Sequence, residues 1–94
     1  MKVRNVISSR SGKAVANQFI ITNANGVYFQ SYDSIIVREP FDSTVVGPQK
    51  IQLDKNYWDY SVTTGRYRNQ FLGETKAETQ KKIDSGEYEL VDLN

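Results

Sequence analysis

The segment best equipped for chemistry is YWDYSVTTGRYR, residues 57–68, which combines aromatic rings, hydroxyl groups and two arginines. We expect a helix to begin inside it, because Ser61, Thr63 and Thr64 carry short hydroxyls that can accept hydrogen bonds from the free N–H groups of a first turn. A helix start flanked by hydroxyls and arginine suits an anion such as phosphate or a carboxylate. Aromatic rings beside arginine also suit single-stranded nucleic acid, because bases stack on rings.

Four bases near the N-terminus extend this segment into a candidate surface for anions or nucleic acid. Arg66 and Arg68 are two positions apart, so on a helix they point to different sides, which argues against a focused phosphate clamp. Trp58 and Tyr67 can equally be core residues, with the arginines solvated. The candidate set is Lys2, Arg4, Arg10, Lys13, Arg66, Tyr67 and Arg68.

The charges are unevenly distributed, although 12 basic and 11 acidic residues leave a net charge of only +1. No Asp or Glu precedes Asp33, and no base follows Lys82. Two arrangements are open: the two ends lie side by side and neutralise each other, or they form separate basic and acidic faces. The net charge alone is too small to indicate nucleic-acid binding.

Catalytic groups are scarce in this sequence. The chain has no His and no Cys, which removes Ser-His and Cys-His systems and the commonest metal ligands. A carboxylate pair drawn from Asp33, Asp42, Asp54 and Asp59 stays open, but none belongs to a calcium-loop motif, and no Gly-rich phosphate cradle is present. We therefore expect a non-enzymatic protein with no catalytic residue, no metal site and no cofactor.

Length and hydropathy predict one domain, residues 1–94, without membrane contact. No apolar run approaches the roughly 20 residues that a membrane span needs. The N-terminal sequence MKVRNVISSRSGKAVA lacks the apolar stretch of a secretory signal. The absence of Cys fits a reducing compartment, so we expect a cytoplasmic protein.

Strand signals dominate the first half of the chain. We expect a strand over residues 2–8, then a β-hairpin formed by NQFIIT and VYFQSY and joined through Asn25-Gly26, which tolerates a type I′ turn. Strand character continues to Pro40, with a bulge or bend at Asp33-Ser34. An irregular connection over residues 41–48, ended by Gly47-Pro48, leads to a strand over residues 50–54.

Helix signals follow. The first helix should end at Gly73, and Thr75 with Glu78 matches the capping box of a second, which Gly86 should end. Tyr88 and Leu90 alternate like a final strand. The expected fold is therefore α+β, a small antiparallel sheet of three to five strands with two short helices in the C-terminal half.

The hairpin is apolar on both of its faces. If no bulge intervenes, one face carries Val27, Phe29, Ile35 and Val37, and the other carries Tyr28, Gln30, Tyr32 and Ile36. Two short helices cannot cover both faces, so the second face either packs against the N-terminal segment or a second copy of the chain, or contacts a partner protein. A homodimer stays open. The candidate protein-binding residues are Phe19, Ile21, Tyr28, Gln30 and Tyr32.

Two strings, NQFIITNANGVYFQSYDSIIV and YWDYSVTTGRYRNQFLGET, carry a resemblance to known proteins. Their Phe-x-Ser-Tyr hairpin and Trp-x-Tyr-Ser-x-Thr-Thr-x-x-Tyr motif, followed by a Phe-Leu helix end, resemble a group of small bacteriophage-encoded proteins of unknown function. The likeness spans residues 12–73, and this chain departs from it by a longer segment over residues 40–47. The matching positions are Phe29, Ser31, Tyr32, Trp58, Tyr60, Ser61, Thr63, Thr64, Tyr67, Phe71 and Leu72.

The resemblance implies an accessory phage protein in the bacterial host cell and transfers no catalytic residue. Proteins of this class often bind and block a host machine, CRISPR nucleases included. Our first hypothesis is therefore a non-enzymatic phage protein that binds a host macromolecule, such as an anti-CRISPR inhibitor of host defence. The alternative is a nucleic-acid-binding protein that uses the basic and aromatic residues above.

Overall fold

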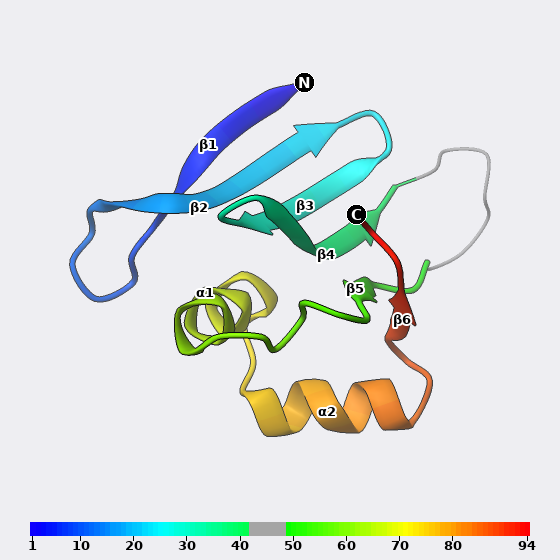
Figure 1. The fold of residues 1–94 in the computed structure, drawn as a ribbon. Helices are drawn as coiled ribbons and strands as arrows, with labels where there is room; N and C mark the ends of the chain where they lie inside the picture. The colour runs from blue at the N-terminus through cyan, green and yellow to red at the C-terminus, as the bar shows by residue number, and fades with distance from the viewer. Residues whose placement is uncertain (42–48) are drawn as a thin grey trace.

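The computed structural model describes residues 1–41 and 49–94 and confirms the α+β class. The predicted irregular connection therefore lies outside the described residues from Asp42 to Pro48, Gly47-Pro48 included. The elements are β1 (Lys2–Ile7), β2 (Ala14–Asn23), β3 (Gly26–Ser31), β4 (Ser34–Pro40), β5 (Gln52–Asp54), α1 (Val62–Leu72), α2 (Lys76–Asp84) and β6 (Glu89–Val91). Both helices lie in the C-terminal half, as predicted (Figure 1).

Within these residues the strands form one sheet in the order β1-β2-β3-β4-β5-β6. The predicted strand number and purely antiparallel pairing are wrong: the sheet has six strands, and β5 pairs with β6 in parallel. The parallel pair arises because the chain leaves β5, crosses through α1 and α2, and returns in the same direction, a connection too long to form a hairpin.

Both helices pack on the same side of the sheet (Figure 1). The core beneath them contains the fully buried Phe29 and Leu53, and half-buried helical residues such as Phe71 and Ile83 pack against it. Phe29 stacks on Phe71 with ring centroids 5.9 Å apart. A buried hydroxyl pair, Ser31 Oγ and Thr64 Oγ1 at 2.8 Å, also joins β3 to α1.

The first hairpin is present, but its turn lies one residue earlier than predicted. Asn23 pairs with Gly26, so Ala24 and Asn25 form the turn, and neither of them has a positive φ. The side chain of Asn23 accepts a hydrogen bond from Asn25 N at 2.8 Å. Position 26 requires glycine because its backbone lies close to β4: a Cβ there would lie 2.3 Å from the carbonyl oxygen of Glu39. When a two-residue turn moves by one position, the pairing of β2 with β3 shifts by two residues. Side chains alternate with a period of two, so Phe19 and Ile21 stay on the face of Tyr28 and Gln30, as predicted.

The chain bends close to the predicted place, in the turn at Tyr32-Asp33 between β3 and β4, whereas the bulge of this second hairpin is at Ile36. Phe29 pairs with Val37 while Gln30 pairs with Ile35, which leaves Ile36 as the extra residue. The extra residue breaks the alternation between Ile35 and Val37. Ile35 shares a face with Gln30, while Ile36 is fully buried in the core. The predicted faces of these two isoleucines were wrong for this reason.

The predicted helix ends are confirmed. The side chain of Ser61 accepts from Thr64 N at the start of α1, and Gly73 ends α1 in the left-handed conformation. Thr75 and Glu78 form the predicted capping box of α2. In the part of the chain that the structure describes, neither helix has the length and apolarity needed to cross a membrane.

Candidate functional site

One face of the sheet is left uncovered by the helices. Phe19 pairs with Gln30 and Ile21 pairs with Tyr28, so these four candidate residues lie together on the face opposite Phe29. All four side chains are half-buried. The sheet continues this surface on both sides, and we call it the open face: Val3, Phe19, Ile21, Tyr28, Gln30, Ile35, Arg38 and Gln52.

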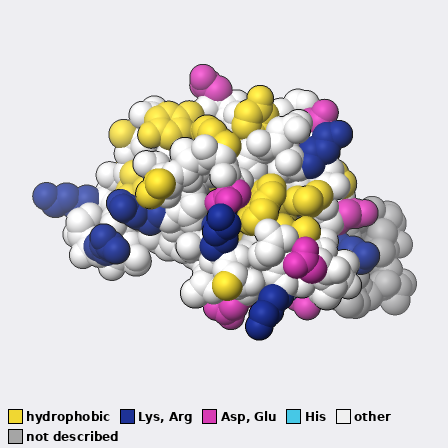
Figure 2. Space-filling model, turned by 60° about the horizontal axis from the view of Figure 1, so that its bottom comes forward, with side chains coloured by type: hydrophobic (Ala, Val, Ile, Leu, Met, Phe, Trp, Pro, Cys, Tyr) yellow, Lys and Arg dark blue, Asp and Glu magenta, His cyan; other side chains and the backbone are white. Residues whose placement is uncertain are grey.

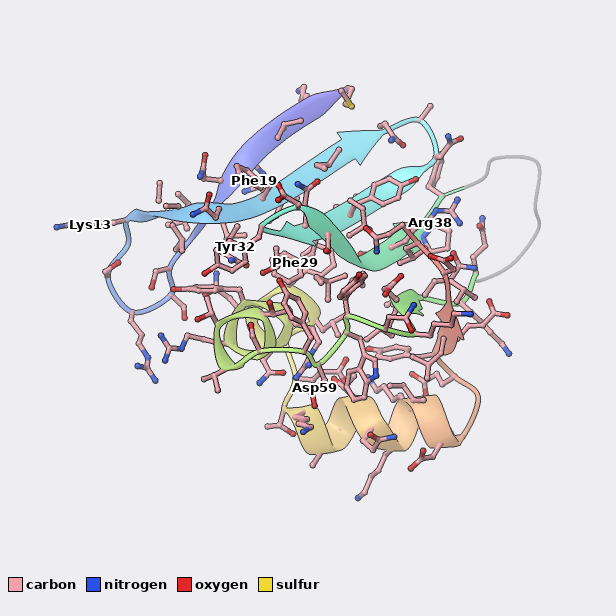
Figure 3. The ribbon with its side chains drawn as sticks, viewed as in Figure 1. Lys13, Phe19, Phe29, Tyr32, Arg38 and Asp59 are labelled. Atoms are coloured by element: carbon pink, nitrogen blue, oxygen red, sulfur yellow. The ribbon has the colours of Figure 1, made fainter. Side chains whose placement is uncertain are left out.

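Tyr32 does not lie in the rows of the open face. It sits in the turn between β3 and β4 with a φ of 55°, and its side chain is exposed. The turn removes it from the alternation of β3, and Figure 3 shows it on the α1 side of β2. Its carbonyl oxygen accepts a hydrogen bond from Gln30 Nε2 at 2.7 Å. Of the five predicted protein-binding residues, the structure thus brings four onto one surface.

A hydrogen-bonded row of polar side chains completes the open face. Arg38, which Figure 3 labels on β4, donates from Nε to the hydroxyl of Tyr28 at 3.3 Å and from Nη1 to Oε1 of Gln52 at 2.9 Å. Gln52 Nε2 then donates to Glu89 Oε1 at 3.3 Å. The guanidinium also lies 6.0 Å from the centroid of the Tyr28 ring. This row spans four strands and fixes the side chains of Tyr28 and Arg38 in place.

The sequence did not single out Arg38, Gln52 or Glu89. Arg38 pairs with Tyr28, and the alternation that places Val37 beside Phe29 also places Arg38 on the open face. Gln52 and Glu89 join this face only through the pairing of β4 with β5 and of β5 with β6, which lie far apart in the sequence. No local pattern could therefore indicate these two residues.

The seven basic and aromatic candidates do not form one surface. Arg10, Arg66 and Tyr67 line one hollow of about 330 Å³, between the loop that joins β1 to β2 and α1. Lys2 and Arg4 lie on β1 at the sheet edge, and Lys13 projects from the same end of the molecule as the loop (Figure 3). Residues 56 positions apart or more are thus brought together at the hollow.

Arg68 lies inside the protein, 1% exposed. Its Nη1 donates to the carbonyl oxygen of Trp58 at 2.5 Å and to Oδ1 of Asp59 at 3.1 Å, and its guanidinium lies 5.1 Å from the centroid of the Trp58 ring. These contacts occupy the guanidinium in holding residues 58–59 against α1. Its burial removes Arg68 from the candidate anion-binding set.

The carboxylates that could have acted in catalysis serve as hydrogen-bond acceptors. Asp54 is fully buried and accepts from the backbone N–H groups of Asn56, Tyr57 and Leu93. Burial opposes its ionisation, but these hydrogen bonds, with one from Asn94, outweigh burial and lower the pKa of Asp54.

The pKa of Asp59 is set by the same two opposing effects. Burial raises its pKa, but Lys76 and Arg68 outweigh that effect and lower it. Lys76 Nζ lies 2.7 Å from Asp59 Oδ2. Asp33 lies in the exposed turn between β3 and β4, and Asp42 is outside the described residues. Across residues 1–41 and 49–94, no three Asp or Glu side chains gather as a metal site would require.

The basic and acidic ends of the chain lie apart. β1, with Lys2 and Arg4, and β6, with Glu89, form opposite edges of the sheet. The ion pairs among the described residues involve Arg68, Lys76 and Lys82 and none of the N-terminal bases. Near the acidic end, the hydroxyl of Tyr88 hydrogen-bonds to Glu74, and burial together with this carboxylate raises the pKa of Tyr88. The two ends therefore do not lie side by side.

Comparison with known proteins places the chain in one family. No curated protein and no solved structure matches it. The model of a family described as "Family of unknown function (DUF8033)" matches residues 1–87, nearly the whole chain. The protein therefore belongs to the DUF8033 family of unknown function.

Proposed function

We propose that this protein is a non-enzymatic binding protein that docks on a host protein through the open face of its sheet. The observation that carries the proposal is the register of β2 and β3, which sets Phe19 and Ile21 beside Tyr28 and Gln30 on the face opposite both helices. A broad, partly apolar sheet face that no described helix or strand covers is a usual docking surface for another protein.

The composition of the open face supports a protein partner. It joins large apolar groups, Phe19 and Ile21, to a tyrosine and an arginine, the residue types that contribute most binding energy at interfaces. The hydrogen bond between Arg38 and Tyr28 holds both side chains in one conformation before binding, which lowers the entropy cost of association.

The path of the N-terminal segment supports the same reading. The sequence left open that the N-terminal segment covers the second face of the hairpin. In the structure it forms β1 and pairs edge to edge with β2, so it widens the open face with Val3 instead of covering it. Val3 is 56% exposed. A second copy of the chain remains the competing occupant.

The resemblance to phage accessory proteins motivates the choice of partner. We propose that the protein acts in the cytoplasm of a bacterial host and blocks a component of host defence, with a CRISPR nuclease as the first candidate to test. The surface chemistry of the open face suits a rigid protein partner, and the scarcity of catalytic groups favours inhibition by occlusion over chemical modification.

Two adjacent residues of β2 offer a matched test. Ile21 lies on the open face and Thr22 on the opposite face, and Thr22 is exposed. Wild-type protein, Ile21→Glu and Thr22→Glu would be used to capture partners from nuclease-treated host lysate, with mass spectrometry as the readout. We expect one host protein to be enriched by the wild type and by Thr22→Glu and lost with Ile21→Glu, because a buried unpaired carboxylate opposes docking.

Two results would contradict the proposal. One is equal capture by both variants, which would mean that the partner uses another surface. The other is a wild-type dimer in light scattering that Ile21→Glu converts to a monomer, because the open face would then be occupied by a second copy. Circular dichroism of each variant separates a loss of docking from a loss of folding.

A further inference from the structure

We propose that Arg10 and Arg66 form a binding site for the backbone phosphates of a single-stranded nucleic acid, in the hollow between the β1–β2 loop and α1. This site is separate from the open face and does not depend on the function proposed for it. The hollow has a volume of about 330 Å³, and its lining contains Ser8, Ser9, Arg10, Arg66, Tyr67, Asn69 and Gln70. No carboxylate of residues 1–41 or 49–94 lines it.

The loop that carries Arg10 is fastened to the helix that carries Arg66. Gln70 of α1 accepts a hydrogen bond from Ser9 N at 3.1 Å and donates one to the carbonyl oxygen of Ile7 at 2.6 Å. Ser8 Oγ accepts from Arg10 N at 3.2 Å. These bonds hold the Arg10 backbone beside α1, so the hollow is built before any ligand arrives.

The charges of the hollow are left unbalanced by the protein. Neither Arg10 nor Arg66 has an ion pair among the described residues, whereas Arg68, two positions further along α1, is paired with Asp59 and bonded to the carbonyl oxygen of Trp58. Two guanidinium groups that share a hollow without a carboxylate repel each other, and an anion relieves this repulsion. Guanidinium matches phosphate through paired N–H donors.

The remaining lining favours a nucleic acid over a free anion. Tyr67, which is partly buried against the core, also lines the hollow, and aromatic rings beside a basic groove bind the bases of single strands by stacking. Figure 2 shows Lys and Arg side chains gathered at the end of the molecule from which the β1–β2 loop projects, with no Asp or Glu among them on that face. A basic cluster of this kind attracts the phosphates of a nucleic acid.

The test measures binding of a fluorescent single-stranded DNA of about ten nucleotides, a length typical of small single-strand sites. Anisotropy titrations would compare wild type with Arg10→Gln, Arg66→Gln and the matched control Arg4→Gln, which removes an exposed arginine on β1 outside the hollow. Inorganic phosphate and a phosphoserine peptide would be titrated in parallel, while NMR follows the Nε–Hε signals of Arg10 and Arg66.

We expect binding to weaken roughly tenfold for Arg10→Gln and for Arg66→Gln, because each loses a charge-assisted hydrogen bond to phosphate. Arg4→Gln should change affinity less than about twofold, and affinity should fall steeply between about 50 and 200 mM salt. Both arginine side-chain signals should shift on adding DNA.

Other outcomes would overturn the proposal. Equal losses for all three variants would show diffuse attraction and no site. Binding of inorganic phosphate or of the phosphopeptide without binding of DNA would show an anion site that serves another ligand. Unbound DNA at low salt, with unshifted Arg10 and Arg66 signals, would remove the site altogether. None of these results bears on docking at the open face, which the Ile21 variants test independently.

Discussion

Arg68 and Asp59 form an ion pair with 3.1 Å between Nη1 and Oδ1, in which the guanidinium is almost completely buried and the carboxylate is 31% exposed. The same guanidinium lies over the ring of Trp58 and donates to its carbonyl oxygen. The segment before α1 is therefore held by one arginine of the helix, which gives Arg68 a structural role that its position in the sequence did not reveal.

Replacing Arg68 should destabilise the fold strongly. Arg68→Met removes the guanidinium and leaves Asp59 with Lys76 alone, so we expect the free energy of unfolding to fall by about 3 kcal/mol. Arg66→Met is the matched control: Arg66 is exposed on the same helix, and its loss should cost less than about 0.5 kcal/mol. Urea unfolding followed by circular dichroism measures both, and equal losses would contradict the burial of Arg68.

Acid should destabilise the protein through Asp54 and Asp59. The pKa of each is lowered in the folded state below its ordinary value of 3.8. The stability that they contribute is therefore fully present above about pH 4 and is lost as the pH falls through the folded pKa. Unfolding free energies at a series of pH values from neutral down to about 2 should decline in this window.

Asp54→Asn isolates the contribution of one carboxylate. The amide cannot titrate and is a poorer acceptor, so the variant should be less stable at neutral pH and should show a shallower decline in acid. Asp33→Asn, in the exposed turn between β3 and β4, should keep the wild-type profile. A profile of Asp54→Asn as steep as that of the wild type would mean that other groups control the acid response.

The bulge in β4 makes opposite predictions for two neighbouring isoleucines. Ile36 is fully buried, whereas Ile35 is half-buried on the open face. Ile36→Ala should lower the free energy of unfolding by about 3 kcal/mol, because it leaves a cavity in the core. Ile35→Ala should cost less than half of that. Denaturant unfolding of the pair tests the register directly, and the reverse order would favour the bulge-free alternation.

Gln18 offers a stabilising change. It is fully buried on β2, and neither atom of its side-chain amide has a hydrogen-bond partner among the residues that the structure describes. Gln18→Met keeps the length of the side chain and removes the unsatisfied polar atoms, so the free energy of unfolding should rise by about 1 kcal/mol. Thermal unfolding provides the measurement. A clear loss of stability would instead indicate that an ordered internal water satisfies the amide in solution.

Local signals in the sequence predicted what lies within a few residues. The capping box of Thr75 and Glu78, the glycine stop at Gly73 and the two-residue hairpin between β2 and β3 all formed. The alternation of strand side chains also predicted that one face carries Phe19, Ile21, Tyr28 and Gln30. This prediction held although the turn is displaced, because side chains on a strand alternate every two residues.

The sequence by itself therefore determined the α+β class, the helix ends and the small supply of catalytic groups. Only the tertiary structure decided the bulge at Ile36, the parallel pairing of β5 with β6, the burial of Arg68 and the meeting of Arg10 with Arg66. The physical reason is the separation along the sequence of the residues that interact. Caps and turns are stabilised by bonds between near neighbours, whereas these four features depend on apolar burial and pairing between distant segments, whose energies no local pattern encodes.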